Sequence, residues 1–366
     1  MNVHGAATWV EVSTDALRAN FAAVAGYAGV PVCAVVKANA YGYGLVECAR
    51  VFSGEGARML AVTRWEEARA IRAAGIDSPV LILTPLPHEV LADAIAMDLD
   101  LCLSGSDLEP LEAAARKAGR VARVHLKIDT GMGRLGVSAR AAFAVAEAVH
   151  ANEHLALEGI WTHFAAAGTD AGRVQAERFE TVRKALGKHA ARAIVHAANS
   201  AATIAHPGSR YDMVRVGTLL YGLDPPNVGV PFSRTDAFTW YARVVGVREL
   251  QPGDTVGYGG EWRARTGMRI ATIPVGWADG FGVEPNARTE SFVEAAKAAG
   301  RVAMVASHRR RSPRAVIIDG RRCPVVGRIS MQQATVVVGA GVREGDVAIV
   351  PARRLLVNPQ IDRVYR

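Results

Sequence analysis

A lysine follows a run of apolar and small residues in the stretch VCAVVKANAYGYG. The run carries Lys37 toward the protein interior, where an ammonium group is costly unless another group pairs with it or neutralises it. Burial lowers the pKa of a lysine, and the resulting neutral amine is a nucleophile suited to forming a Schiff base with a carbonyl compound. Lys37 is therefore our first candidate for covalent chemistry.

Further reactive or hydrogen-bonding side chains stand at the ends of other β-rich runs. In a barrel of parallel strands, catalytic side chains gather at the C-terminal ends of the strands. A single strand histidine is more often a hydrogen-bonded core residue than a catalytic one, but the number of strand ends involved here favours a functional site. The side chains concerned are those of Lys127, Asp129, His163, Asn199, Ser200 and Arg215.

The same region offers groups that could bind a phosphate. Ser200 supplies a hydroxyl, and Gly217 with the backbone of Thr218 supplies amide donors. Aldolases and pyridoxal 5'-phosphate (PLP) enzymes both use a Schiff-base lysine, and phosphate donors are a requirement of the second class. An arginine such as Arg215 would keep the pyridine nitrogen of PLP unprotonated, whereas a carboxylate would keep it protonated.

The pattern of the first two thirds of the chain predicts the elements that position these residues. Between Val32 and Gly222, short β-rich runs alternate with amphipathic, alanine-rich helical stretches. Eight βα units in one compact region predict a closed (β/α)8 barrel of the TIM type. The eight predicted strands lie in residues 32–37, 58–64, 79–85, 99–104, 122–129, 157–165, 193–200 and 211–222.

Beyond the GLDPP stretch, the helical spacing gives way to β-rich runs separated by turn signals such as QPGD and IDGR. We therefore expect an α/β plus β protein, with a PLP-binding barrel over residues 8–230 and a mostly β C-terminal domain over residues 231–366. The stretch 284–312 contains one short helical pattern and an arginine run, and it is expected to be an exposed insertion.

Composition excludes several other classes of protein. The 366 residues contain no apolar run of the roughly 20 residues that a membrane-spanning helix needs, and the N-terminus does not resemble a secretory signal, so we expect a cytoplasmic protein. The four cysteines show no C-x-x-C spacing, so no metal is expected. The net charge of +8 is read as a solvated basic surface, because no aromatic-interleaved basic motif indicates nucleic-acid binding.

Nine motifs of the chain occur in the order and context of those of the alanine racemases. They are TWVEVSTDALRAN, AVVKANAYGYG, VHLKIDTGMGRLGV, EGIWTHFA, HAANSAAT, DMVRVGTLLYGLDP, VGYGGEW, IPVGWADGF and VGRISM. An ordered set is far more specific than a single motif such as KxNxYG. From about Thr8 to Val338 the chain thus resembles that family, which implies a PLP enzyme built as a barrel followed by a β domain.

The resemblance implies two acid/base residues. Lys37 would hold PLP as an imine and also exchange a proton with the substrate on one face of the cofactor. Tyr258, in VGYGG, would be the second base, placed on the opposite face by the β domain of the partner subunit in a homodimer with shared active sites. Racemisation removes the α-proton on one face of a planar intermediate and returns one on the other, so two bases must flank the cofactor.

The resemblance also implies the other contacts to the cofactor. The implied cofactor-binding residues are Tyr41, Ser200, Gly217 and Thr218 at the phosphate, His163 against the ring, Asn199 at its rim and Arg215 at the pyridine nitrogen.

Substrate contacts are implied for residues of both domains. Arg134 and the backbone of Met331, the latter from the partner chain, would receive the substrate carboxylate. Lys127 matches a lysine that family members often carry as a carbamate, an anion that would orient Arg134. The expected function is the PLP-dependent racemisation of a small amino acid, with L-alanine converted to D-alanine.

The chain departs from the family pattern around the substrate. Trp277 replaces the tyrosine of GYADG, and Gln332 replaces the acidic residue that usually follows SM. A Thr-x-x-Tyr-Glu segment has no counterpart near the C-terminus. A serine or broad-specificity racemase is therefore an alternative. A non-catalytic PLP-binding protein is a second alternative, but such a protein would not need Tyr258. A barrel-type amino-acid decarboxylase is a third, but Cys323 does not match the cysteine motif of that class.

Overall fold

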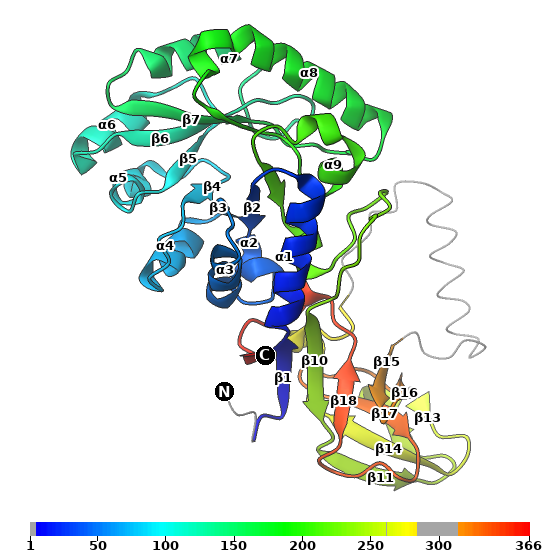
Figure 1. Cartoon of the computed structure of the whole chain (residues 1–366). Coiled ribbons are helices and arrows are strands. Elements are labelled where there is room, and N and C mark those ends of the chain that lie inside the picture. The colour runs from blue at the N-terminus through cyan, green and yellow to red at the C-terminus, as the bar shows by residue number, and fades with distance from the viewer. Residues whose placement is uncertain (1–4, 261, 284–313) are drawn as a thin grey trace. The chain divides into compact units, whose positions relative to one another are not determined.

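The computed structural model describes residues 5–260, 262–283 and 314–366. These residues form two compact units: Ser13–Ala237, and the chain up to Val12 together with the chain from Phe238 (Figure 1). The insertion expected over residues 284–312 lies outside the described residues. Within the described part of the chain, no helix is both long enough and apolar enough to cross a membrane.

The first unit contains the eight expected parallel strands. They are β2 (Val32–Val35), β3 (Met59–Val62), β4 (Val80–Ile82), β5 (Asp100–Leu103), β6 (Ala122–Lys127), β7 (Leu155–Trp161), β8 (Ile194–His196) and β9 (Val214–Val216). They follow one another around one sheet in chain order, and β9 pairs with β2. Backbone N–H groups of Asp212 and Arg215 donate to the carbonyls of Val195 (3.0 Å) and Ala198 (2.8 Å), which links the β8 and β9 edges. The predicted TIM-type barrel is confirmed.

Helices connect successive strands and cover the outside of this barrel (Figure 1). The longer helices carry their small and apolar side chains on one stripe; in the sixth helix the buried residues are Leu111, Ala114 and Ala115, at the three- and four-residue spacing of one helical face. The helices are α1 (Thr14–Ala28), α2 (Lys37–Tyr41), α3 (Leu45–Gly54), α4 (Trp65–Ala73), α5 (His88–Ala96), α6 (Glu109–Ala118), α7 (Ala139–His150), α8 (Asp170–Leu186) and α9 (Ser200–Ala205).

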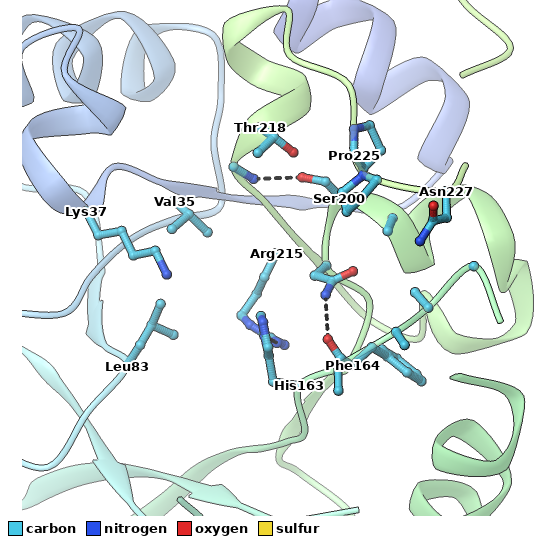
Figure 2. A pocket seen from close by; sticks show the side chains of 18 of the residues that line it. Val35, Lys37, Leu83, His163, Phe164, Ser200, Arg215, Thr218, Pro225 and Asn227 are labelled. Carbon is cyan, nitrogen blue, oxygen red and sulfur yellow. Dashed lines mark hydrogen bonds between the residues drawn. The ribbon is translucent and has the colours of Figure 1, made fainter. Parts of the chain in front are cut away.

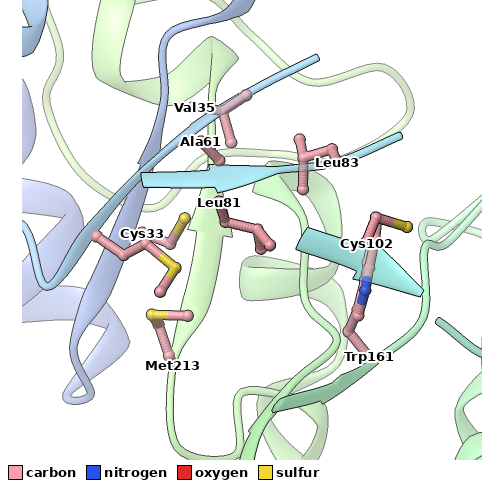
Figure 3. Packing of buried hydrophobic residues seen from close by; sticks show 9 residues of the cluster. Cys33, Val35, Ala61, Leu81, Leu83, Cys102, Trp161 and Met213 are labelled. Atoms are coloured by element: carbon pink, nitrogen blue, oxygen red, sulfur yellow. The ribbon is translucent and has the colours of Figure 1, made fainter. Parts of the chain in front are cut away.

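Small and medium-sized side chains fill the interior of the barrel, as expected for strands buried on both faces. Figure 3 shows Cys33 and Val35 from β2 packed with Leu81 from β4, together with Cys102 from β5 and Trp161 from β7. Trp161 closes this cluster with a large ring that is almost completely buried. The packed interior fixes the strand ends, and through them the side chains described below.

The second unit is built on a nine-stranded sheet, which confirms the expected β domain. Its strand order is β11-β14-β17-β16-β15-β18-β10-β1-β19, and β12 and β13 form a separate pair. The strands are β1 (Thr8–Val12), β10 (Phe238–Arg243), β11 (Gly246–Leu250), β12 (Thr255–Val256), β13 (Trp262–Arg263), β14 (Met268–Ile273), β15 (Ala315–Ile318), β16 (Arg321–Val326), β17 (Ala334–Val338), β18 (Val347–Val350) and β19 (Arg363–Tyr365).

The boundaries of the two units differ from the expected 8–230 and 231–366. β1 pairs antiparallel with β10 along its whole length, from Thr8 opposite Ala242 to Val12 opposite Phe238, so the start of the chain belongs to the β unit. In the barrel unit, Asn20 of α1 donates to the carbonyl of Thr235 (2.8 Å) and accepts from its backbone N–H (2.8 Å). These bonds keep the connection up to Ala237 with the barrel.

Candidate active site

Lys37 stands where β2 ends and the chain enters a left-handed turn. Ala38, Asn39, Ala40 and Tyr41 have φ values of 55°, 54°, 51° and 56°. Residues with a Cβ disfavour this conformation by about 1–2 kcal/mol each, and such strain is typical of functional sites. The turn ends in two glycines, with the Gly44 N–H donating to the carbonyl of Asn39 (3.0 Å).

The carboxylate of Glu67, on α4, supports this turn. Its Oε1 accepts hydrogen bonds from the backbone N–H groups of Ala38 (2.5 Å) and Asn39 (3.3 Å). Its Oε2 accepts from Thr63 and Arg64, both at 3.2 Å, at the end of β3. One side chain thus joins the first two strand ends of the barrel. Glu67 was not among the residues expected from the sequence, although an acidic residue at the third position of a helix is the signal of a capping box.

Replacing Glu67 with alanine is expected to destabilise the protein by about 1–3 kcal/mol, because four backbone donors lose their acceptor. Glu66→Ala is the matched control: its exposed side chain neighbours Glu67, and its loss should change stability by no more than about 0.5 kcal/mol. The free energy of unfolding in urea measures both. Equal stabilities of the two variants would show that the turn does not depend on Glu67.

A pocket of about 280 Å³ opens at the C-terminal ends of the barrel strands. Figure 2 shows Lys37 reaching into it from one side, with Arg215, His163 and Ser200 on the other. The pocket brings together every residue for which a cofactor contact was expected: Lys37, Tyr41, His163, Asn199, Ser200, Arg215, Gly217 and Thr218. They come from the ends of β2, β7, β8 and β9.

Hydroxyl and amide groups line one end of this pocket. Ser200 Oγ accepts a hydrogen bond from the N–H of Gly217 (3.1 Å), and Asn199 donates to the carbonyl of Phe164 (3.1 Å) while capping α9 (Figure 2). A Cβ at Gly217 would lie 2.2 Å from the Tyr41 hydroxyl, so only glycine lets that hydroxyl approach. Burial raises the pKa of Tyr41 to about 12 and keeps the phenol as a donor. The hydroxyls of Tyr41 and Ser200 are donors that suit a phosphate group.

Burial and nearby positive charge both act on the amine of Lys37. Burial lowers its pKa most, the charges of Arg134 and Arg215 lower it further, and Glu67 opposes them. A larger share of the amine is therefore neutral, which is the nucleophilic form.

The guanidinium of Arg215 lies at the base of the pocket, only 3% exposed. It donates to the carbonyls of His196 (2.6 Å) and Thr162 (2.7 Å), and its Nη2 is 3.3 Å from His163 Nδ1. Burial lowers the pKa of Arg215 to about 10, so the group remains a cation at neutral pH. Burial, followed by the charge of Arg215, lowers the pKa of His163 to about 3. His163 is therefore neutral, and its Nδ1 accepts from Arg215.

Lys127 and Arg134 lie close to this pocket but are not among its lining residues. The ammonium of Lys127 is buried 4.3 Å from the centroid of the Trp161 ring, and burial lowers its pKa. Arg134 is exposed on the loop after β6, where the carboxylate of Asp129 accepts hydrogen bonds from the N–H groups of Gly131 and Met132, each at 2.9 Å, and of Gly133. These bonds give the loop a defined shape.

Tyr258 and Met331 belong to the β unit and are exposed at its surface. Tyr258, between β12 and β13, is 72% exposed, and Met331 is 63% exposed. Trp277 lies on a neighbouring loop, because the N–H of Ala278 donates to the carbonyl of Met331 (2.9 Å). Trp277 is itself half exposed, and Gln332 is exposed too. This unit therefore presents several large side chains that the unit itself does not cover.

The fold and the pocket together define the class of protein. It is a near-closed (β/α)8 barrel followed by a β domain, and one rim of the barrel carries a lysine, an arginine and hydrogen-bond donors suited to a phosphate. The family model described as alanine racemase, N-terminal domain, matches residues 12–225. The model described as alanine racemase, C-terminal domain, matches residues 237–308 and 305–362. The chain belongs to the alanine racemase family.

Relatives and solved structures agree with this assignment. The alanine racemase of Symbiobacterium thermophilum is 37% identical over 357 residues, which cover 95% of this chain and 88% of that protein. That of Geobacillus stearothermophilus is 37% identical over 340 residues, covering 90% and 80%. The structure of alanine racemase from Clostridium difficile matches with a TM-score of 0.87 and 28% identity, over 98% of this chain and 96% of that chain.

Proposed function

We propose that the protein racemises a small amino acid with PLP as cofactor, and that it converts L-alanine to D-alanine. The observation that carries this proposal is the lining of the pocket. It combines a lysine of lowered pKa, hydrogen-bond donors suited to a phosphate and a buried arginine. Membership of the alanine racemase family supports the reaction and the substrate.

The residues present fit PLP. The hydroxyls of Tyr41 and Ser200, with the backbone at Gly217 and Thr218, would hold the phosphate. Lys37 would bind the carbonyl carbon covalently, and Arg215 would donate to the pyridine nitrogen. His163 would pack against the ring, and Asn199 would lie at its rim. When bound, PLP makes the α-proton of an attached amino acid acidic by accepting its electrons.

Two bases of this protein would then exchange that proton. The amine of Lys37 serves one face, and its lowered pKa increases the share of the neutral form, which can accept a proton. The phenol of Tyr258 serves the other face. Arg134 binds the substrate carboxylate together with the backbone of Met331, and Lys127, as a carbamate, holds the Arg134 guanidinium in place.

We propose that Tyr258 and Met331 act in the site of a second copy of the chain, in a two-fold dimer. An exposed tyrosine, methionine and tryptophan on one unit are typical of a surface that a partner covers. In a two-fold dimer each contact occurs twice, so both sites would be completed at once.

The test is direct. Protein supplied with PLP is incubated with single L-amino acids, and the enantiomers are separated by chiral chromatography. We expect D-alanine from L-alanine, with a kcat/KM above that for serine or a basic amino acid. Without racemisation of any amino acid, a non-catalytic PLP-binding protein becomes the better description.

A serine or broad-specificity racemase is the second candidate. It is favoured by Trp277 and Gln332, which stand on the exposed loops beside Met331. A preference for another amino acid by more than about tenfold, roughly 1.4 kcal/mol of transition-state stabilisation, would show that these two residues have changed the substrate pocket.

A further inference from the structure

Buried polar side chains continue from Arg215 through the interior of the barrel, away from the pocket. Arg215 Nη1 lies 3.2 Å from His196 Nδ1, on β8. His196 Nε2 lies 2.9 Å from His125 Nδ1, on β6. His125 Nε2 faces Asp100 Oδ2, on β5, at 3.8 Å. Of these four side chains, only Arg215 takes part in the function proposed above. All four are almost fully buried.

A glycine of β7, Gly159, leaves the space in which this row of side chains packs. A Cβ at position 159 of β7 would lie 2.2 Å from His125 Nδ1, so a glycine there is required for the imidazole to reach His196. The pairing of β6 with β7 shifts register between Val124 and His125, directly opposite this glycine. A bulge and a glycine at the same point are the means by which a sheet redirects a side chain.

The hydrogen bonds fix the protonation of both imidazoles. A guanidinium only donates, so His196 Nδ1 must accept from Arg215. Burial lowers the pKa of His196 well below its ordinary value, so this ring is neutral and carries its proton on Nε2. That N–H then donates to His125 Nδ1. His125 is neutral as well, and its own proton must be on Nε2.

The row ends at a carboxylate. Asp100 accepts from Arg123 Nε at 2.5 Å, and Arg123 also contacts Asp98. Burial raises the pKa of Asp100, whereas Arg123 lowers it. His125 Nε2 has no hydrogen-bond partner among the described residues. At 3.8 Å, Asp100 acts on the N–H of His125 through its charge, which favours a proton on the nitrogen that faces it.

We propose that Asp100 and His125 are positioning residues for Arg215. They hold His196 in the tautomer whose Nδ1 accepts from the guanidinium. In the opposite tautomer, two N–H donors would face each other at 3.2 Å, and Arg215 would lose a contact that fixes it at the base of the pocket. The proposal rests on the proposed function only because that function gives Arg215 its role at the cofactor. The tautomers of His125 and His196 do not depend on that function.

The test uses the full chain without cofactor, labelled with ¹⁵N in its histidine rings. Correlations through the ring protons show which nitrogen is protonated, and a His125→Gln variant identifies the signals of the pair. We expect His125 and His196 both to be protonated on Nε2. A wild-type spectrum with His196 protonated on Nδ1 would overturn the proposal without any variant.

Asp100→Asn and Asp98→Asn form the matched pair of variants. Both replacements remove a carboxylate that contacts Arg123, but only Asp100 faces His125. We expect Asp100→Asn to populate the second tautomer and Asp98→Asn to leave the spectrum unchanged. Identical spectra for the two variants would contradict the role of Asp100.

Activity supplies a separate readout. With PLP bound, Asp100→Asn should lower kcat about tenfold and leave KM nearly unchanged, since one hydrogen bond to a charged group is weakened. An unchanged kcat would argue against a positioning role. If the wild-type protein shows the expected tautomers but racemises no amino acid, the proposed function fails and the tautomer assignment stands.

Discussion

Replacing Lys37 with alanine is expected to lower kcat more than about 10³-fold and to prevent covalent attachment of PLP. The change removes both the nucleophile and one of the two proposed bases, and a single positioned acid/base group already contributes about 10²–10⁴-fold. Borohydride reduction of the wild-type protein with PLP, followed by peptide mapping, should leave a pyridoxyl group on Lys37. The Lys37→Ala variant should lose the imine absorbance.

The matched control is Lys184→Ala, which removes an exposed lysine of α8 that pairs with Glu180 (3.5 Å), and it should keep full activity and the same adduct. A pyridoxyl group on another lysine would refute the assignment. The reaction should also depend on pH in a defined direction. Because burial and two arginines lower the pKa of Lys37, its reaction with PLP should persist to a lower pH than that of an exposed lysine. It should slow as the pH falls through that lowered pKa.

Replacing Tyr258 with phenylalanine is expected to lower racemisation by about 10²–10⁴-fold, since the ring remains and only the proton-exchanging hydroxyl is lost. Lys37 would still serve one face of the substrate. The variant should therefore exchange the α-proton of one alanine enantiomer with deuterium from the solvent while forming little of the other. Mass spectrometry of the recovered alanine measures this exchange.

The control for Tyr258 is Tyr241→Phe, at a tyrosine of β10 that stacks on Trp9 in the sheet of the β unit. This variant should racemise alanine at a nearly normal rate. Equal losses in the two variants would indicate a general effect on the β unit. Loss of exchange for both enantiomers in Tyr258→Phe would contradict a role confined to one face.

Mixed dimers test whether the two bases come from different chains. Lys37→Ala and Tyr258→Ala should each be nearly inactive alone, because every site then lacks one base. In a mixed dimer with shared sites, one site carries both changes and the other carries neither. Activity should return toward half of the wild-type value per mixed dimer. Mixed dimers that form but stay inactive would show that both bases belong to the same chain.

The barrel could be predicted because its strands are buried on both faces. Such strands read as continuous apolar runs, and seven of the eight predicted runs contain a whole strand of the barrel. The remaining run, 157–165, overlaps β7, which already begins at Leu155. Strand ends could be located in the same way, which is why Lys37, His163, Ser200 and Arg215 were expected at one rim. The residues that bridge one element to another were not predicted: a capping-box signal at Glu67 concerns its own helix and does not indicate that the side chain also reaches Ala38 and Asn39.

The observed boundary between the two units differs from the expected one because of β1. β1 is five residues long, and only its pairing with β10 shows that it belongs to the β unit. Pairing between segments far apart in the chain depends on the sheet as a whole. A short alternating run gives no information about which distant strand will be its neighbour.

The sequence by itself thus determined the order of elements, the set of chemical groups and the strand ends on which most of them stand, because periodicity and turn residues act locally. Only the tertiary structure decided which polar groups meet inside the barrel. Asp100, His125 and His196 come from three different strands, and Gly159 from a fourth strand leaves the space in which they approach. Desolvation, which sets their protonation, arises only when those strands close around them.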